Sequence, residues 1–357
     1  MNFGPSLFSA LLKCFLPELE FPHSRTLLTS VPHSVGGALS DYDDGVVPIL
    51  IIGFNRPEFL ANLISIVRKV APEKVYLAID GPRQGNLNEF DQVVASRATA
   101  ELLDWGCNVE TLFHDENLGC GGAVTSALSW FFENEESGII LEDDLEPTLE
   151  FFKYCEVMLD RYRGDASVMS IAGSNFVPID FFDPLTDYHF SRYPHVWGWA
   201  TWRRTWNEYR FDISNWESEI SYFKLWRASG MSLLTALYFA HTFNRIKKQN
   251  LDTWDAQLML QALISGALTV TPNRNLVENQ GFDSKTATHT NQVPLYLVPA
   301  SADEHEYLAI EVDSHETADK WVNRNQYGGA VKTRLAKFCR QNARKVNRRN
   351  TRGGRPE

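Results

Sequence analysis

The sequence predicts an α/β fold in which a mostly parallel central sheet is flanked by helices. The first observation is that short apolar runs alternate with segments of helical periodicity between residues 46 and 150. This alternation is typical of strand–helix–strand units, whose crossover helices cover both faces of a parallel sheet. The second observation is that polar residues directly follow several of the apolar runs. In open sheets of this kind, ligands bind at the carboxyl ends of the strands.

The first half of the expected domain consists of four strands and the helices between them. We expect a buried strand where apolar residues run together, and a helix where they recur every three or four positions. The expected strands are 46–54, 75–79, 109–113 and 138–141, and the expected helices are 58–70, 93–103 and the segment that follows Gly122. Right-handed crossovers would then place the carboxyl ends of these strands along one edge of the sheet.

The second half of the chain is less regular. Expected strands at 168–172 and 269–271 accompany a mostly helical segment at 216–248 and a helix at 258–264. Segment 192–206 contains four tryptophans, which either line a groove, because flat rings stack on sugar faces, or form a hydrophobic cluster. We expect three parts in all: an N-terminal extension (1–45), the α/β domain (46–300) and a C-terminal extension with a basic tail (301–357).

Length and composition are those of a soluble globular protein. The chain has 357 residues, of which 44% are apolar and 22% are charged. No apolar run is long enough to span a bilayer. The Leu- and Phe-rich start lacks the basic residues and cleavage site of a signal peptide, so it either rests on a membrane or packs on the domain. Five cysteines without paired spacing predict neither a disulfide framework nor a zinc site, which favours a reducing cytoplasm.

The net charge of −11 is unevenly distributed, because the residues from Lys332 onward hold ten Lys or Arg and a single acid. This tail either contacts anionic lipid or is a solvated, disordered segment. Its basic residues are not interleaved with aromatic ones, so we expect no nucleic-acid partner. We therefore expect a cytoplasmic protein, either free or held peripherally on the inner membrane face by its N-terminus or its tail.

Three consecutive carboxylates, Glu142, Asp143 and Asp144, follow the expected strand at 138–141. They repel one another there unless a cation joins them, and a hard divalent metal that carries phosphates has the right chemistry. The alternative is an acidic, solvated loop or a first helical turn, where acids favour the helix dipole. Pro147 is the expected start of the next helix.

Polar residues also follow the first two expected strands, and they should converge on the acidic triplet at the sheet edge. These are Asn55 and Arg56 after the first strand, and Asp80 and Gly81 after the second. Asn117 and the glycine-rich segment 119–122 come after the third strand, without the spacing of a dinucleotide-binding fingerprint. Gly119 either lets the backbone approach a ligand or serves ordinary loop geometry.

In these residues and their order the sequence resembles glycosyltransferases of the nucleotide-diphospho-sugar (GT-A) fold. More narrowly, it is similar to the N-acetylglucosaminyltransferase I family and its bacterial relatives. The resemblance covers roughly residues 46–289. It rests on Leu141-Glu-Asp-Asp-Leu-Glu146 with Phe151-Phe152, Asn55-Arg56, Asp80-Gly81, Gly198-Trp199 and Trp254-Asp255. The Glu-Asp-Asp-Leu motif is fairly specific, whereas the other motifs are weak when taken alone.

The resemblance implies a role for each residue of the acidic triplet. In that family the last aspartate, here Asp144, binds the Mn²⁺ (or Mg²⁺) ion that bridges the donor diphosphate. The first residue, here Glu142, holds the ribose, and Asp143 lies close to the diphosphate and the sugar. Arg56 and Asp80 contact the nucleotide. The further candidates for donor binding are Asn55, Gly81, Asn117 and Gly119.

The resemblance also makes Asp255 the catalytic base. An acceptor hydroxyl needs a carboxylate within hydrogen-bond reach to take its proton, and one base without a covalent nucleophile implies inversion at the anomeric carbon. The alternative for Asp255 is an N-cap of the following helix, with Asp252 and Thr253 as rival caps. His289 either adds a contact to the metal or the diphosphate, or is a loop histidine.

The expected activity is therefore metal-dependent, inverting hexosyl transfer in polysaccharide biosynthesis. A UDP-sugar is the expected donor, and a glycan or lipid-linked sugar is the expected acceptor. A nucleotidyltransferase on the same fold is one alternative, but the position of its glycine- and arginine-rich phosphate loop reads Gly53-Phe-Asn-Arg-Pro57 here. A non-catalytic carbohydrate-binding protein is the other, and the intact acidic triplet argues against it.

Overall fold

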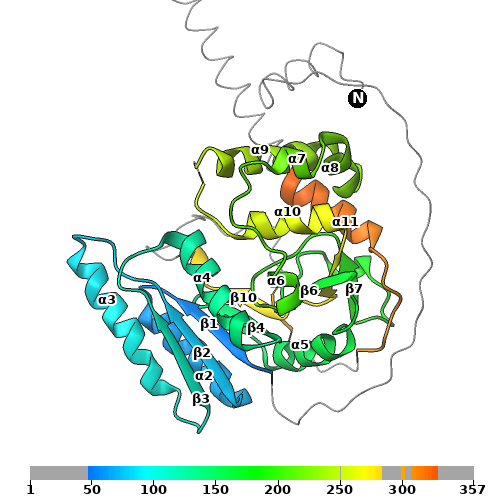
Figure 1. The fold of residues 1–357 in the computed structure, drawn as a ribbon. Helices are drawn as coiled ribbons and strands as arrows, with labels where there is room; N and C mark the ends of the chain where they lie inside the picture. Colours follow the sequence, from blue (N-terminus) through cyan, green and yellow to red (C-terminus); the bar gives the residue numbers. More distant parts are fainter. Residues whose placement is uncertain (1–46, 250, 284–298, 302–306, 329–357) are drawn as a thin grey trace, which may run out of the picture. The chain divides into compact units, whose positions relative to one another are not determined.

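The computed structural model describes residues 47–249, 251–283, 299–301 and 307–328 (Figure 1). Their centre is an eight-stranded sheet in the order β3-β2-β1-β4-β8-β6-β9-β7. The pairs β3–β2, β2–β1, β1–β4 and β6–β9 are parallel, and the other three are antiparallel. The strands are β1 (Ile49–Gly53), β2 (Lys74–Ile79), β3 (Asn108–Phe113), β4 (Ser137–Glu142), β6 (Val168–Ala172), β7 (Tyr188–Ser191), β8 (Trp199–Trp202) and β9 (Leu268–Pro272). The predicted α/β class with a mostly parallel sheet is confirmed.

Helices surround this sheet. They are α2 (Pro57–Val70), α3 (Leu87–Ala98), α4 (Gly119–Asn134), α5 (Leu149–Arg161), α6 (Arg203–Trp206), α7 (Trp216–Glu219), α8 (Tyr222–Ala228), α9 (Leu233–Lys247), α10 (Asp255–Ser265) and α11 (Glu316–Val322). Helices α7, α8, α9 and α11 gather at the end of the domain away from α2 and α3 (Figure 1). No helix within the described ranges is both long and apolar enough to cross a membrane.

The alternation of side chains along β1 separates two hydrophobic cores. Ile49 and Ile51 belong to the core that α2, α3 and α5 cover, whereas Leu50 and Ile52 belong to the core under α4 and α10. Successive side chains of a strand point to opposite faces, so a central strand must be apolar at every position. This is why the first apolar run of the sequence reads as one uninterrupted strand.

The expected strands of the first half are present, but one helix boundary was wrong. The helix expected at 93–103 begins at Leu87, and its last turn, Thr99–Leu102, is a 3-10 helix. The Asn86 side chain caps the new start by accepting the Glu89 N–H at 3.2 Å. The apolar residues of the first turn, Leu87 and Phe90, are exposed and do not belong to the buried face, so apolar periodicity alone does not reveal it.

The segment after the acidic triplet also differs from the expectation. Instead of starting a helix at Pro147, the chain forms a short strand, β5 (Leu145–Pro147), antiparallel to β10 (Val277–Asn279). Helix α5 begins only after Thr148, whose Oγ1 accepts the Phe151 N–H at 3.3 Å. The three acids therefore lie at the end of β4 and in the turn to β5, and the suggestion of a first helical turn is wrong.

Among the described residues beyond 300, Tyr307 is buried in the hydrophobic core, and α11 and the π-helical turn Asn323–Tyr327 pack on the domain. Helix α11 lies against β7, where the Ser191 hydroxyl donates to Asp319 Oδ1 at 2.8 Å. Just after α11, Asn323 Oδ1 accepts the Tyr193 hydroxyl at 2.8 Å. The predicted domain boundaries at 45 and 300 stay predictions. The N-terminal extension, the basic tail and His289 lie outside the described residues, and so do the membrane contacts expected of both ends.

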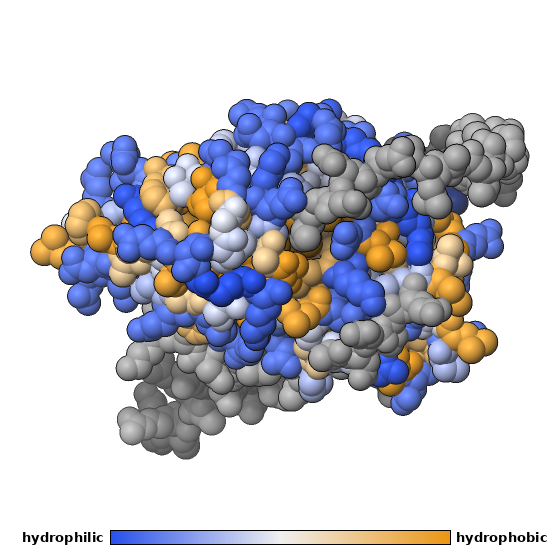
Figure 2. All heavy atoms as spheres, turned by 90° about the horizontal axis from the view of Figure 1, so that it is seen from below, coloured by the Kyte–Doolittle hydropathy of each residue, from blue (hydrophilic) through white to orange (hydrophobic). Residues whose placement is uncertain are grey.

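Hydrophobic side chains reach the surface in separate patches. On the face seen from below, orange patches alternate with hydrophilic ones (Figure 2). Exposed apolar residues occur on several different elements, among them Leu87 and Phe90 on α3, Leu149 on α5 and Phe223 on α8. Scattered exposure of this kind is normal for a globular protein.

Candidate functional site

The polar residues that follow β1, β2 and β4 meet in one cleft of about 590 Å³. It lies at the carboxyl ends of three adjacent parallel strands, and its size is that of an ordinary small-ligand site. The sequence candidates on its lining are Asn55, Arg56, Asp80, Asn117, Gly119, Glu142, Asp143, Asp144 and Asp255. The convergence expected from the order of the strands is thus present, although their individual roles stay predictions.

Arg56 joins two of the acids. Its Nε donates to Asp143 Oδ2 at 3.3 Å, its Nη2 contacts Asp143 Oδ1, and its Nη1 donates to Asp144 Oδ2 at 3.0 Å. The Asp143 side chain is only 3% exposed, so the guanidinium replaces the water that the carboxylate has lost. Arg56 is therefore the internal counter-ion of the acidic turn, a role that the sequence analysis did not assign to it.

The acidic cluster carries more negative charge than this one guanidinium balances. Burial, followed by the charges of Asp144 and Asp143, raises the pKa of Glu142 well above its ordinary value. Burial also raises the pKa of Asp143, although Arg56 opposes the shift. A divalent cation would relieve this repulsion, and Asp144, with 16% of its side chain exposed, is an accessible ligand. These oxygen ligands suit a hard ion that is bound by one carboxylate of the protein and by the phosphate groups of a ligand.

The structure offers such an ion few other protein ligands. Within the described ranges no group of three His, Cys, Asp or Glu side chains is arranged to hold a metal. An ion bound at Asp144 would therefore take most of its ligands from phosphate oxygens and water, as Mg²⁺ commonly does in enzymes that bind nucleotides.

The carboxylate of Asp80 is already bound by its own chain. Its Oδ1 accepts the N–H groups of Gly81 at 2.8 Å and Leu118 at 3.0 Å, and its Oδ2 accepts the Asn117 side chain at 2.8 Å. Burial raises the pKa of Asp80, while these backbone bonds oppose the shift. Asp80 thereby ties the end of β2 to the segment before α4. Any bond to a nucleotide would be additional to these.

The two candidate glycines allow close packing within the protein. Gly81 is buried and does not line the cleft, and a Cβ there would overlap the backbone of Glu116. Gly119 has a φ of +77°, and a Cβ on it would lie 2.5 Å from Asp252 Oδ2. What approaches the glycine-rich segment most closely is therefore a carboxylate of the same chain.

Asp255 lies on the cleft lining as the first residue of α10. Its Oδ1 accepts the Ala256 N–H at 2.9 Å and contacts Thr253 Oγ1. The N-cap position belongs to Trp254, so the suggestion that Asp255 is an N-cap is wrong. The side chain is exposed and lines the same cleft as Glu142.

The four tryptophans of segment 192–206 divide between the two suggested roles. Trp199, Trp202 and Trp206 are buried in the core, whereas Trp197 lines the cleft. The Trp197 ring is held edge-on by Phe176 and Phe282, with ring centres 5.2 and 5.3 Å apart. One aromatic face is therefore positioned beside the acidic cluster, and the other rings build the core behind it.

The sequence analysis missed two cleft residues that come from β10 and the turn after it. Asn279 and Gly281 line the cleft, and Gly281 lies so close to Asp144 that a Cβ would overlap its carboxylate. The Gln280 N–H donates to the Asp144 carbonyl oxygen at 2.8 Å, so the turn after β10 is also bonded to the main chain of the acidic turn. A strand of three residues carries little periodicity, so its pairing with β5 left no signal in the sequence.

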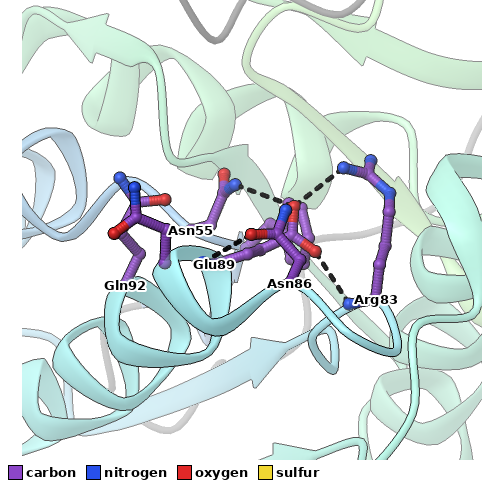
Figure 3. Close-up of a pocket in the computed structure, with 7 residues that line it drawn as sticks. Asn55, Arg83, Asn86, Glu89 and Gln92 are labelled. Atoms are coloured by element: carbon purple, nitrogen blue, oxygen red, sulfur yellow. Dashed lines mark hydrogen bonds and ion pairs between the residues drawn. The ribbon is translucent and has the colours of Figure 1, made fainter.

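A second pocket, of about 320 Å³, adjoins the cleft and shares Phe54, Asn55 and Arg83 with it. Figure 3 shows the buried Glu89 carboxylate at its centre. Glu89 accepts the Arg83 N–H at 2.7 Å and Arg83 Nη1 at 2.8 Å. These bonds fix the loop between β2 and α3, so the pocket has a rigid, polar lining. This pocket was not predicted from the sequence, because Glu89 lies outside the helix expected at 93–103.

Comparisons with known proteins add a general likeness. No family model matches the sequence, and no curated protein matches it. Among solved structures the chain is similar to the mannosyltransferase PcManGT from Pyrobaculum calidifontis in complex with GDP-Man and Mn²⁺. The identity is 13%, the match covers 62% of this chain and 70% of that one, and the TM-score is 0.36.

Two further solved structures show likenesses of the same order. HddC from Yersinia pseudotuberculosis, complexed with GMP-PN, is 11% identical over 47% of this chain and 82% of that one, with a TM-score of 0.30. The bifunctional glycosyltransferase WbbM, without ligand, is 15% identical over 64% of this chain and 39% of that one, also with a TM-score of 0.30. Likenesses this distant assign neither a family nor a substrate, so the function must be argued from the cleft.

Proposed function

We propose that this protein is a metal-dependent, inverting glycosyltransferase that moves a sugar from a nucleotide-diphospho-sugar to a hydroxyl of a glycan or lipid-linked acceptor. The observation that carries the proposal is that Asp144 and Asp255 line the same cleft from different elements, the β4–β5 turn and the start of α10. Two separate acids meet the two needs of the reaction, a ligand for a cation on the donor side and a base on the acceptor side.

On the donor side, Asp144 would hold Mn²⁺ or Mg²⁺, and Arg56 orients its carboxylate. The ion, when bound, would stabilise the negative charge that develops on the leaving diphosphate. Glu142 and Asp143 complete the acidic floor. The residues proposed to bind and orient the nucleotide are Asn55, Arg56, Asp80, Asn117, Gly119 and Glu142.

On the acceptor side, Asp255 would take the proton of the attacking hydroxyl. Its exposed carboxylate is free of ion pairs among the described residues, which suits a group that must accept a proton. Attack then occurs directly at the anomeric carbon, and the configuration inverts because no covalent intermediate forms. Trp197 offers a flat apolar face on which one sugar ring of the donor or the acceptor would stack.

The narrower part of the proposal is a UDP-sugar donor and kinship with the N-acetylglucosaminyltransferase I family. It rests on the Glu142-Asp-Asp-Leu145 motif and on Trp254-Asp255, which occur in the family's order. A nucleotidyltransferase is the weaker candidate. Only three residues, Phe54, Asn55 and Arg56, separate β1 from α2, which leaves no room for a long phosphate-binding loop.

A thermal-shift screen of nucleoside diphosphates and nucleotide sugars, with and without Mn²⁺, tests the proposal. A ligand that binds the native state raises the melting temperature by mass action. We expect a Mn²⁺-dependent rise with UDP and with one UDP-sugar. A rise with GDP and a GDP-sugar instead would correct the base and keep the reaction. No shift with any nucleotide, together with glycan binding that needs no metal, would favour the non-catalytic carbohydrate-binding protein.

A further inference from the structure

Asp252 caps a helix that lies far from it in the sequence. Its Oδ2 accepts the Cys120 N–H and its Oδ1 accepts the Gly121 N–H, each at 2.9 Å. These are first-turn donors of α4, whose own N-cap residue, Leu118, makes no side-chain cap bond. A carboxylate is stabilised at this end of a helix by the unpaired N–H groups and by the helix dipole. The segment before α10 is therefore fastened to the start of α4.

Two glycines are what allow this approach. A Cβ on Gly119 would lie 2.5 Å from Asp252 Oδ2. A Cβ on Gly121 would lie 2.8 Å from both Asp252 Oδ1 and the Thr253 carbonyl oxygen. Contacts this short cannot be accommodated without movement, so side chains at these positions would push segment 251–254 away from α4. The backbone of the glycine-rich segment thus binds the carboxylate of Asp252, a residue of the same chain.

The same segment is held at its other end by buried groups. Trp254 is 3% exposed and stacks on Trp199 of β8, with ring centres 5.6 Å apart. The Tyr209 hydroxyl donates to the Trp254 carbonyl oxygen at 3.0 Å. The Gln257 side chain donates to the Thr253 carbonyl oxygen at 2.8 Å. Asp255 follows directly, so its place in the cleft is determined by anchors on both sides.

We propose that Asp252 is a positioning residue for Asp255. By fastening segment 251–254 to the N-terminus of α4, it sets the position of the Asp255 carboxylate relative to the acidic turn at the end of β4. This inference rests on the proposed function, since it gives Asp252 a part in placing the general base. Displacing a reacting group by about 1 Å can cost on the order of 100-fold in rate. Loss of this one anchor should therefore lower the rate without removing the donor site.

The experiment compares D252N, which removes the negative charge and one of the two accepting oxygens, and G121A, which places a Cβ against Asp252, with the matched controls D183N and G164A. Asp183 also binds a loop N–H, that of Leu185 at 2.9 Å, but lies outside the cleft lining. A Cβ on Gly164 would meet nothing within 4 Å. The assay is hydrolysis of a panel of UDP- and GDP-sugars with Mn²⁺, in which water takes the sugar in place of an acceptor hydroxyl and nucleoside diphosphate is released. Hydrogen exchange reports on the amides of Cys120 and Gly121.

We expect D252N and G121A to expose these amides and to lower kcat by 10- to 100-fold, with KM for the donor sugar within about twofold of wild type. The controls should retain wild-type kcat. The D252N change should cost almost nothing further in a D255N background, because a residue that acts through Asp255 has no effect once Asp255 is removed. A residue that only stabilises the fold would instead lower kcat equally in both backgrounds.

Two results would overturn the inference while the proposed function stands. One is an active wild type whose kcat is unchanged in D252N. The other is a D252N loss that persists in full in the D255N background. Failure of the proposed function has a different signature, because the wild-type protein itself would then release no nucleoside diphosphate from any sugar of the panel.

Discussion

Arg56 Nη1 donates to Asp144 Oδ2 at 3.0 Å, so a cation of the chain already holds the carboxylate proposed to bind the metal. The same guanidinium also contacts the buried Asp143. A side chain held in this way gives up less conformational freedom when a ligand binds. The donor site is in this respect organised before any donor arrives.

The first prediction concerns Asp144. In D144N the affinity for UDP measured by calorimetry with Mn²⁺ should fall at least about tenfold, which corresponds to about 1.4 kcal/mol. The affinity with Mn²⁺ falls because an amide is a poor ligand for a hard cation. The affinity measured without metal should change little, since no ion is then bound. E146Q is the control, since Glu146 is exposed on β5 and accepts a bond from Gln280 at 3.0 Å. Equal affinity of D144N and wild type with Mn²⁺ would exclude Asp144 as the ligand.

The second prediction concerns the internal counter-ion. R56A should lower the free energy of unfolding by about 3–5 kcal/mol, because it leaves the buried Asp143 carboxylate without its counter-ion and with only the Phe54 N–H as a donor. R210A breaks an exposed pair with Glu219 and should cost at most about 1 kcal/mol. Urea unfolding measures both values. Similar costs for the two variants would mean that Asp143 does not depend on Arg56.

The third prediction separates two roles of Asp255. If it is the base, D255N should lower kcat by on the order of 10²- to 10⁴-fold while the dissociation constant of UDP with Mn²⁺ stays the same. If it only favours the start of α10, the variant should lose a few tenths of a kcal/mol in stability and retain its kcat. Steady-state kinetics and unfolding of the same preparation decide between these outcomes, with D183N as the control.

The fourth prediction concerns the aromatic face in the cleft. W197A should raise the KM for the sugar that stacks there about tenfold, or about 1.4 kcal/mol, with a smaller effect on kcat. W226A removes a half-buried tryptophan of α8 that does not line the cleft, so it controls for lost aromatic packing. An unchanged KM for both donor and acceptor in W197A would show that no sugar uses this face.

The fifth prediction concerns acid stability. His189 is buried, its Nδ1 lies 2.9 Å from Asn273 Oδ1, and burial lowers its pKa to about 3. In the unfolded chain the imidazole of His189 binds a proton at about pH 6.5, whereas in the folded chain it stays neutral at that pH. The free energy of unfolding should therefore fall as the pH drops from about 6.5 towards 3, by up to about 1.4 kcal/mol per pH unit.

H189Q should make this loss shallower, as measured by urea unfolding at a series of pH values between 7 and 4. H195Q should have a similar effect between about pH 6.5 and 4, because burial also lowers the pKa of His195 to about 4. The double variant should show a shallower loss than either single variant, although less than the sum, because the charge of His195 itself lowers the pKa of His189. Parallel pH profiles for H189Q and wild type would mean that His189 is not the group that titrates.

The sequence predicts the first half of the sheet well, because β1, β2 and β4 are covered on both faces and are mostly apolar, and the exposed edge strand β3 still carries Val109, Leu112 and Phe113. The acidic triplet is found for the same reason, since it stands where such a run stops. Contacts between distant segments are not found. Asp252 meets Gly121 across 131 residues, and Gly281 meets Asp144 across the β5–β10 pair. Neither contact imposes a local period on the chain, so composition and spacing cannot indicate it.

The aromatic segment shows the same limit in another form. The sequence of each of the four tryptophans is compatible both with a groove and with a core. Only the tertiary packing distinguishes Trp197, which lines the cleft, from the other three, which are buried. Likewise, Glu89 lies outside the helix expected at 93–103, yet it is buried in the first turn of α3 and accepts two bonds from Arg83. Burial of single polar residues depends on tertiary structure that local pattern does not encode.

The Asp252 cap also has a consequence for the biosynthesis of the protein. The carboxylate that completes the first turn of α4 lies 131 residues downstream of Gly121. At roughly 5–20 residues per second, the ribosome needs roughly 7–26 s to add that interval. At the start of this time β1 to β3 are already synthesised and β4 follows, while the glycine-rich turn lacks its partner. A nascent chain released before residue 252 would carry the acidic turn without Asp252 and Asp255, so a prematurely terminated product would lack both the proposed base and the residue proposed to position it.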